Sequence, residues 1–117
     1  MQKPGILTQL EQLGGKRVLR VRGALTLPNG EAFRQALMEA LQPGETTFLD
    51  LSQATGVDIC GLQLICSAHR TFFRAKAGFE LEARPAWFKE AARHAGFYKR
   101  TLGCPFRDTA ACLWEKE

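Results

Sequence analysis

The residues best suited to chemistry in this sequence lie in one short run, Asp58-Ile59-Cys60-Gly61-Leu62. A thiol at the start of a helix can be activated as a nucleophile, because the helix N-terminus stabilises negative charge. The Asp58 carboxylate nearby opposes this activation, since two negative charges repel each other. Two interpretations of Cys60 therefore stay open: a redox-active thiol, or a small residue that fits its place. Asp58 could cap the helix, contact a partner, or do both.

Elsewhere the sequence offers little for catalysis or metal binding. No G-x-x-x-x-G-K phosphate loop occurs, and no pair of histidines has metal-ligand spacing. His69 is expected to be a hydrogen-bonded core residue and His94 an exposed one. A metal between Cys104 and Cys112 would have only two visible ligands. We therefore expect a protein that is not an enzyme and that binds neither a cofactor nor a metal. Its four cysteines, expected to be reduced thiols, are Cys60, Cys66, Cys104 and Cys112.

Length and composition predict one globular domain over residues 1–117, since 45% of the residues are hydrophobic and 24% are charged. The chain has neither a long apolar run for membrane insertion nor the apolar core of a signal peptide. A cytoplasmic location is therefore expected. The net charge of +4 does not call for nucleic acid as a partner. Six basic residues and one acid between Arg84 and Arg107 form either a solvated face or a surface for an acidic partner or anionic lipid.

The first half of the chain is predicted to form a hairpin and a helix. Apolar residues alternate over Ile6–Leu13 and Lys16–Gly23, and Gly14-Gly15 between these runs is a turn signal. One face of this antiparallel pair is apolar and the other is basic. From Glu31 the apolar residues follow a helical period, which Pro43-Gly44 ends. The predicted core residues of this helix are Phe33, Ala36, Leu37, Ala40 and Leu41.

The second half is predicted to alternate strands with helices. A central strand over Thr46–Leu51 leads through a loop to a helix over Cys60–Ala75, and Phe79–Ala83 forms the next strand. A third helix starts at Pro85 and carries Phe88, Ala91, Ala92 and Ala95 on its apolar face, up to Gly96. Beyond it we expect a short strand within 97–106 and a last helix capped by Asp108 or Thr109. The core stripe predicted for the helix over Cys60–Ala75 is Leu62, Ile65, Cys66, His69, Phe72 and Phe73.

Three segments, in this order, resemble the STAS domain family, named for sulfate transporters and anti-sigma factor antagonists. VLRVRGALTL resembles the family's second strand and its following Gly-x-Leu. TFLDLSQATGVDICGLQLI resembles the core signature, in which a strand ending in D-L-S precedes a short loop and D-S-S-G-L opens a helix. HAGFYKRTLGCPFRDTAACLW resembles the family's ending. The resemblance implies an α/β fold, with a mixed central sheet of four or five strands packed with about four helices.

The resemblance also implies a regulatory binding module. Antagonist members of the family bind a kinase-type anti-sigma factor through the loop after the third strand and the start of the next helix. A serine directly after the loop aspartate is their switch, because its phosphorylation brings charge into the interface. Here Ile59 stands at the switch position and Cys60 at the second hydroxyl position. The family positions that are kept, together with the loop serine, are Asp50, Ser52, Asp58, Gly61 and Leu62.

These observations predict a binding module that has lost the phosphate switch. Its partner would be a serine kinase or anti-sigma factor, docked on Ser52 to Leu62. The alternative is a constitutive accessory subunit, such as small STAS proteins form in lipid-transport ATPases or beside chemotaxis components. A sensor of a small ligand or nucleotide is a third, weaker hypothesis. The sequence leaves the oligomeric state open.

Overall fold

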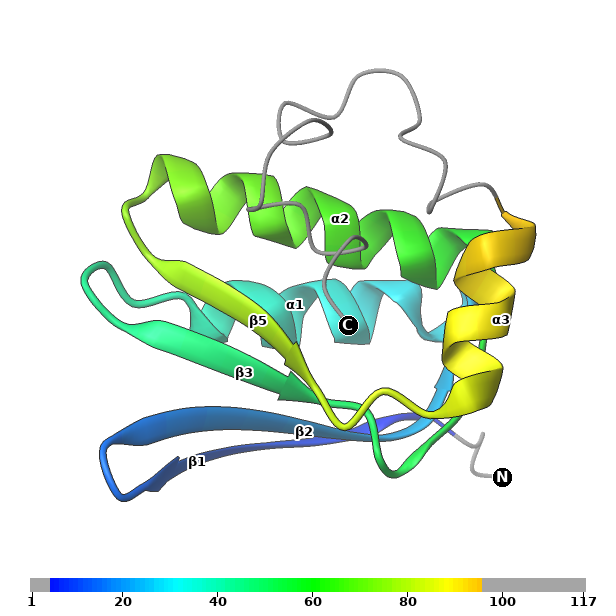
Figure 1. Cartoon of the computed structure of the whole chain (residues 1–117), viewed down its shortest axis with the longest axis horizontal. Helices are drawn as coiled ribbons and strands as arrows, with labels where there is room; N and C mark the ends of the chain where they lie inside the picture. The colour runs from blue at the N-terminus through cyan, green and yellow to red at the C-terminus, as the bar shows by residue number, and fades with distance from the viewer. Residues whose placement is uncertain (1–4, 96–117) are drawn as a thin grey trace.

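The computed structural model describes residues 5–95, which form a mixed five-stranded sheet with two helices lying along one of its faces (Figure 1). Four strands follow the order β1-β2-β3-β5, and β4 pairs with β2 beyond the end of β3. The β1–β2 pair is antiparallel and the other pairs are parallel. The strands are β1 (Leu7–Leu13), β2 (Lys16–Leu25), β3 (Thr46–Asp50), β4 (Ala54–Val57) and β5 (Gly78–Glu82).

The predicted hairpin is confirmed. Gly14 and Gly15 have φ values of 56° and 81° and join β1 to β2, with Leu13 opposite Lys16. Positive φ at both central residues is the geometry of the two-residue turn that matches the twist of a hairpin, and glycine adopts it without steric cost. The predicted apolar face of β2 is found at Leu19 and Val21, which are buried in the core. The opposite face is not purely basic, since Val18 on it is buried at 4% exposure.

One prediction about the segment before the second helix is wrong: residues 54–57 are not a loop. They form β4, which runs parallel to the end of β2 and pairs Leu25 with Val57. β2 is ten residues long, so its first half pairs with β3 and its second half is left to pair with β4. The alternation of apolar residues is too short in 54–57 to predict a strand, and pairing with β2 supplies the stability that the sequence pattern does not show.

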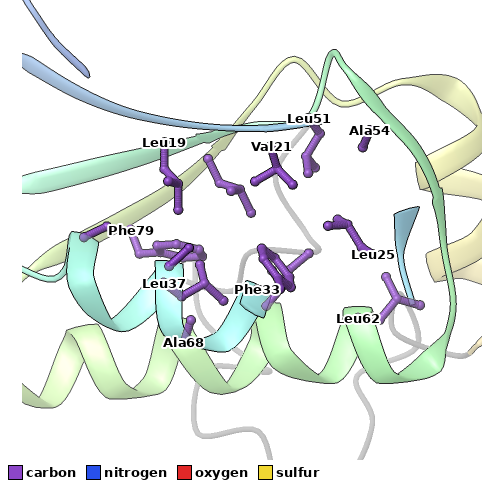
Figure 2. Packing of buried hydrophobic residues seen from close by; sticks show 14 of the residues in the cluster. Leu19, Val21, Leu25, Phe33, Leu37, Leu51, Ala54, Leu62, Ala68 and Phe79 are labelled. Carbon is purple, nitrogen blue, oxygen red and sulfur yellow. The ribbon is translucent and has the colours of Figure 1, made fainter. Parts of the chain in front are cut away.

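Helices α1 (Gly30–Ala40) and α2 (Ile59–Arg74) lie side by side and enclose the core against the sheet (Figures 1 and 2). The core stripe of α1 is as predicted, except that Leu41 lies just beyond the helix and is half-buried. Figure 2 shows how Phe33 and Leu37 of α1 and Leu62 of α2 point toward the strands. The large core side chains with under 2% exposure include Phe33, Phe72, Phe88, Leu19, Leu25, Leu37, Leu49, Leu51, Leu62, Ile65 and Val21.

The stripe predicted for α2 is only partly right. Leu62, Ile65 and Phe72 are buried, but Phe73 is 62% exposed. Successive residues turn by about 100° around a helix, so Phe73 cannot share the inward direction of Phe72. Ala68, at 2% exposure, lies between Ile65 and Phe72 in the buried stripe and belongs to the core.

Helix α3 (Ala86–His94) stands across the end of the sheet, against β4 (Figure 1). Phe88 and Ala92 are buried as predicted, Ala91 is half-buried and Ala95 is exposed. The preceding strand ends at Glu82 rather than Ala83, whose φ of 57° is not a strand conformation. The predicted fold class is confirmed. The described residues contain three of the expected four or so α-helices, and the strand within 97–106 and the last helix lie outside them.

Candidate functional site

The residues singled out by the sequence lie between the end of β3 and the first turn of α2, at the end of the sheet where the parallel strands finish (Figure 1). β4 aligns this segment along β2, and α2 begins two residues after β4 ends. In open α/β sheets, ligands and partners commonly meet this end of the strands, because helix N-termini and loops gather there.

Asp58 holds the start of α2 in place. Its Oδ1 accepts a hydrogen bond from the Gly61 N–H at 3.1 Å, and its Oδ2 accepts one from the Leu27 N–H at 3.0 Å. Its own N–H donates to the Leu25 carbonyl oxygen at 3.2 Å. The first bond is the capping interaction expected of an aspartate before a helix, so that interpretation is confirmed. The second ties the helix to the end of β2, which local sequence cannot predict.

Gly61 lies where α2 touches the backbone of β2. A Cβ atom at this position would stand 2.2 Å from the Leu25 carbonyl oxygen and 2.9 Å from a methyl carbon of Val57. Real Cβ atoms do not approach an oxygen so closely, so only glycine lets the helix start here. Leu62 follows with 1% exposure, and its N–H donates to the Asp58 carbonyl oxygen at 3.0 Å. Asp58, Gly61 and Leu62 therefore fix the turn against β2 and the core.

Asp50 is also bound within the chain. Its Oδ1 accepts from the Ser52 N–H at 2.9 Å, and its Oδ2 accepts from the Arg20 Nε at 3.2 Å. Burial is the largest single influence and would raise the pKa of Asp50, but the hydrogen bonds from Ser52 and Arg20 and the Arg20 charge together outweigh it. The pKa of Asp50 therefore lies below its ordinary value. The Asp50 carboxylate thus makes structural hydrogen bonds to a loop N–H and to Arg20, and Arg20 also pairs with Glu11.

Ile59 and Cys60 lie on the other side of the turn. Ile59 is the first residue of α2 and is 46% exposed, although it is a large apolar side chain. Cys60 is half-buried, with a free thiol. Ser52 is exposed in the turn after β3. Of the two positions where the resemblance expects hydroxyl groups, position 59 is thus exposed and position 60 is half-buried, and both follow the hydrogen-bonded Asp58.

A groove of about 910 Å³ begins at this turn and runs between α1 and α2. Ile59 and Leu27 stand together at its start, and Leu27 is 68% exposed. The sequence Leu27-Pro28-Asn29-Gly30 is typical of a loop and does not by itself mark Leu27 as a binding residue. A large apolar residue in a Pro-Asn-Gly turn was the available signal, since such turns usually expose polar residues. The other lining residues are Gly30, Glu31, Arg34, Cys60, Gln63, Leu64, Cys66, Ser67, Arg70 and Ala95.

The charged groups near the turn are engaged within the chain. Both carboxylates near the turn accept hydrogen bonds inside the chain, so neither is held free for proton transfer. Within residues 5–95, no three metal-binding side chains gather in one place. Cys104 and Cys112 lie outside these residues. No α-helix in the described part of the chain is both long enough and apolar enough to pass through a membrane.

Comparison with known families decides the classification. The family described as "Mlab, STAS domain" matches residues 8–103, most of the chain. The chain belongs to the STAS family. The matched region includes all but the first residue of β1, every element from β2 to α3, and the turn described above. No curated protein is a significant match in sequence.

Solved structures share this fold. An anti-sigma factor antagonist from Mycobacterium paratuberculosis is 22% identical, with a TM-score of 0.68 and 83% of each chain covered. The STAS domain of an anti-sigma factor antagonist from Rhodobacter sphaeroides is 29% identical, with a TM-score of 0.52 over 65% of this chain and 84% of that one. The murine anion transporter Slc26a9 is 22% identical, with a TM-score of 0.67 over 83% of this chain. The chain spans only 16% of that transporter and 19% of Mglu, another structure of this fold.

Proposed function

We propose that this STAS protein is a non-enzymatic, regulatory protein-binding module that docks through residues 52–62. Its partner would be a serine kinase or anti-sigma factor, and phosphorylation of the turn would not control the complex. We also propose that residues 1–117 form one domain and that the protein is cytoplasmic. Membership of the STAS family and the fold shared with anti-sigma factor antagonists support the class of function.

The exposed side chain of Ile59 carries this proposal. Ile59 is a branched aliphatic residue that is 46% exposed on the first turn of α2. Covering this remaining surface stabilises a complex by about 0.7–1.4 kcal/mol, roughly half the value for burying a fully exposed side chain. Leu27, at the same end of the groove, widens the apolar surface. We call Leu27 and Ile59 the apolar spot. In this proposal Ser52, Ile59 and Cys60 contact the partner, while Asp50, Asp58, Gly61 and Leu62 hold the turn in shape.

The loss of the switch follows from the residue types. Neither the isoleucine at 59 nor the cysteine at 60 can accept a phosphate as a serine does. A phosphorylated serine would bring roughly two negative charges beside the Asp58 carboxylate. With an apolar residue there, we expect binding to be controlled by the amount of protein, by competition, or by another modification.

The alternative is a constitutive subunit of an assembly such as a lipid-transport ATPase or a chemotaxis complex. The apolar spot favours it, because permanent interfaces are more hydrophobic than those that open and close. A surface that must separate on demand would benefit from a residue that can be phosphorylated, and neither Ile59 nor Cys60 accepts phosphate as a serine does.

Affinity capture from native extract, followed by mass spectrometry, tests these proposals. A kinase or sigma-control protein that is retained by the wild-type chain and lost with Ile59→Asp would support the first, and an ATP-binding subunit with the same behaviour would support the alternative. Phe73→Asp is the matched control, since Phe73 is a 62% exposed residue near the other end of α2. A partner retained equally by Ile59→Asp would contradict docking at the turn.

The lost switch has a separate test. The purified chain is incubated with the captured partner or kinase and ATP, and its intact mass is measured. We expect no phosphate on the turn. Stoichiometric phosphate on this chain would refute the proposal that phosphate no longer controls it.

A further inference from the structure

Strand β1 presents an open edge. In the described residues it is the end strand of the sheet, paired on one side with β2. Leu7, Leu10 and Leu13 are 66%, 42% and 48% exposed. Proteins usually protect an edge strand with lysine, proline, a bulge or short length, because its free N–H and C=O groups attract another strand. β1 is seven residues long, pairs with β2 without a bulge, and has Glu11 as its single charge.

The strand at the other end of the described sheet differs. β5 has five residues, including Glu80 and Glu82, and residues with positive φ lie close to both of its ends: Lys76 at 63° and Ala83 at 57°. Charges and irregular ends are the usual protection of an edge. The exposed leucines are therefore a property of β1 rather than of sheet edges in this protein generally.

We propose that β1 pairs antiparallel with β1 of a second copy of this chain, about a two-fold axis through Leu10. The strand sequence, Leu-Thr-Gln-Leu-Glu-Gln-Leu, is nearly the same in chemistry when read in either direction. In this register Leu7 lies opposite Leu13 of the second copy, and Thr8 opposite its Gln12. Gln9 lies opposite its Glu11, and the two Leu10 residues meet at the axis. A two-fold interface must be self-complementary in this way.

The side chains of both faces fit this pairing. The register with β2 places Leu7, Gln9, Glu11 and Leu13 on the face of Arg20, and Leu10 on the face of the core residue Leu19. Opposite residues in an antiparallel pair have Cβ atoms about 4.5–5.5 Å apart. The end leucines would therefore form two apolar contacts on the face without helices, and the Leu10 pair one contact on the helix side.

The charge of Glu11 does not oppose the dimer. The two Glu11 residues would be diagonal neighbours, which are about 7–8 Å apart in antiparallel pairs. Each is already paired with Arg20 of its own chain, and the Gln9 Nε2 donates to it at 2.8 Å. In the dimer the Gln9 amide of the second copy stands opposite the same carboxylate. The ion pair between Glu11 and Arg20 in each chain thus offsets the repulsion between the two Glu11 carboxylates.

Sedimentation velocity over a wide concentration range, with reductant present, tests the pairing. A seven-residue strand pair is smaller than the standard interface of about 1,600 Å², so we expect a reversible dimer of micromolar affinity. Leu10→Lys puts two positive charges at the axis and should leave the chain monomeric. Leu27→Lys changes an exposed leucine away from β1 and should leave the dimer intact. Thermal unfolding of the dilute variants checks that each is folded.

A pair of double variants tests the register itself. Thr8→Glu with Gln12→Lys places opposite charges across both symmetric contacts, whereas Thr8→Lys with Gln12→Lys places like charges there. The Thr8→Glu/Gln12→Lys variant should dimerise at least tenfold more tightly than the Thr8→Lys/Gln12→Lys variant. Both variants carry the same substitution at Gln12, which pairs with Arg17 of β2, so any effect on the hairpin from that position is the same. Equal behaviour of the two variants, a monomeric wild-type chain, or a dimer abolished by Leu27→Lys but not by Leu10→Lys would each overturn the proposal. Because Leu10→Lys and the two double variants leave both residues of the apolar spot unchanged, failure here is distinct from failure of docking at the turn.

Discussion

The two sides of the turn before α2 differ in what they do. On the inner side Asp58, Gly61 and Leu62 contact β2, the β2–α1 connection or the core through hydrogen bonds and close packing. On the outer side Ile59 and Leu27 expose apolar surface. Residues adjacent in sequence therefore have separate roles, because a helix start directs successive side chains in different directions. The inner side can be kept for folding while the outer side changes its binding chemistry.

This contrast explains how the turn can keep Asp58 and Gly61 while Ile59 and Cys60 stand at the two positions where the resemblance expects hydroxyl groups. Asp58 and Gly61 satisfy the helix N-terminus and the contact with Leu25 whatever the partner is. The residues at 59 and 60 have fewer such constraints. Inner-side substitutions should therefore lower stability, and outer-side substitutions should change binding alone.

The largest effect is expected for Gly61→Ala. The added Cβ would stand 2.2 Å from the backbone oxygen of Leu25, which cannot move without shifting β2. We expect the free energy of unfolding, measured by urea denaturation, to fall by about 3 kcal/mol or more. Gly56→Ala is the matched control, since a Cβ there meets no atom within 4 Å. Similar losses in the two variants would show that the close approach at Gly61 is not the cause.

Removing the Asp58 carboxylate should have a smaller effect. Asp58→Ala leaves the N–H groups of Gly61 and Leu27 without their acceptors, and loss of a helix cap costs about 0.5–2 kcal/mol. Asp58→Asn keeps one side-chain oxygen and should be nearer to wild type in the same denaturation experiment. If alanine and asparagine destabilise equally, the charge rather than the hydrogen bonds is what Asp58 contributes.

Asp50 should give a smaller, pH-dependent effect. Its pKa in the folded chain lies below the ordinary value, so its carboxylate stabilises the fold above the unfolded-state pKa of about 3.9. This stabilisation is lost as the pH falls through the folded-state pKa. The difference in unfolding free energy between wild type and Asp50→Asn should thus be present at neutral pH and disappear on acidification. A difference that grows at low pH would contradict the lowered pKa.

The elements of the fold that the sequence predicts are those determined by residues close together in the chain. The Gly14-Gly15 turn, the stripe of α1 and the cap at Asp58 follow from neighbouring residues, and all three are confirmed. β4 depends on free pairing positions in β2, and the Arg20–Asp50 contact joins residues 30 positions apart, so neither has a local pattern. The burial of Phe73 was predicted wrongly.

In the candidate site, too, the local sequence predicts some features, while others depend on contacts between distant parts of the chain. A glycine in the first turn of a helix signals a close approach, but not that the Leu25 oxygen is the atom approached. The exposure of Leu27 and Ile59 depends on where α1 and α2 end, which periodicity predicts only to within a few residues.

The most direct test is the affinity of the captured, purified partner for the wild-type chain, Ile59→Asp and Phe73→Asp, measured by isothermal titration calorimetry. An acidic residue in the first turn of a helix is compatible with its dipole, so Ile59→Asp should unfold within about 0.5 kcal/mol of wild type. We predict that Ile59→Asp loses at least tenfold in affinity, because an apolar contact is replaced by a buried charge, while Phe73→Asp binds as wild type. Equal affinity of all three proteins would contradict docking through the outer side of the turn.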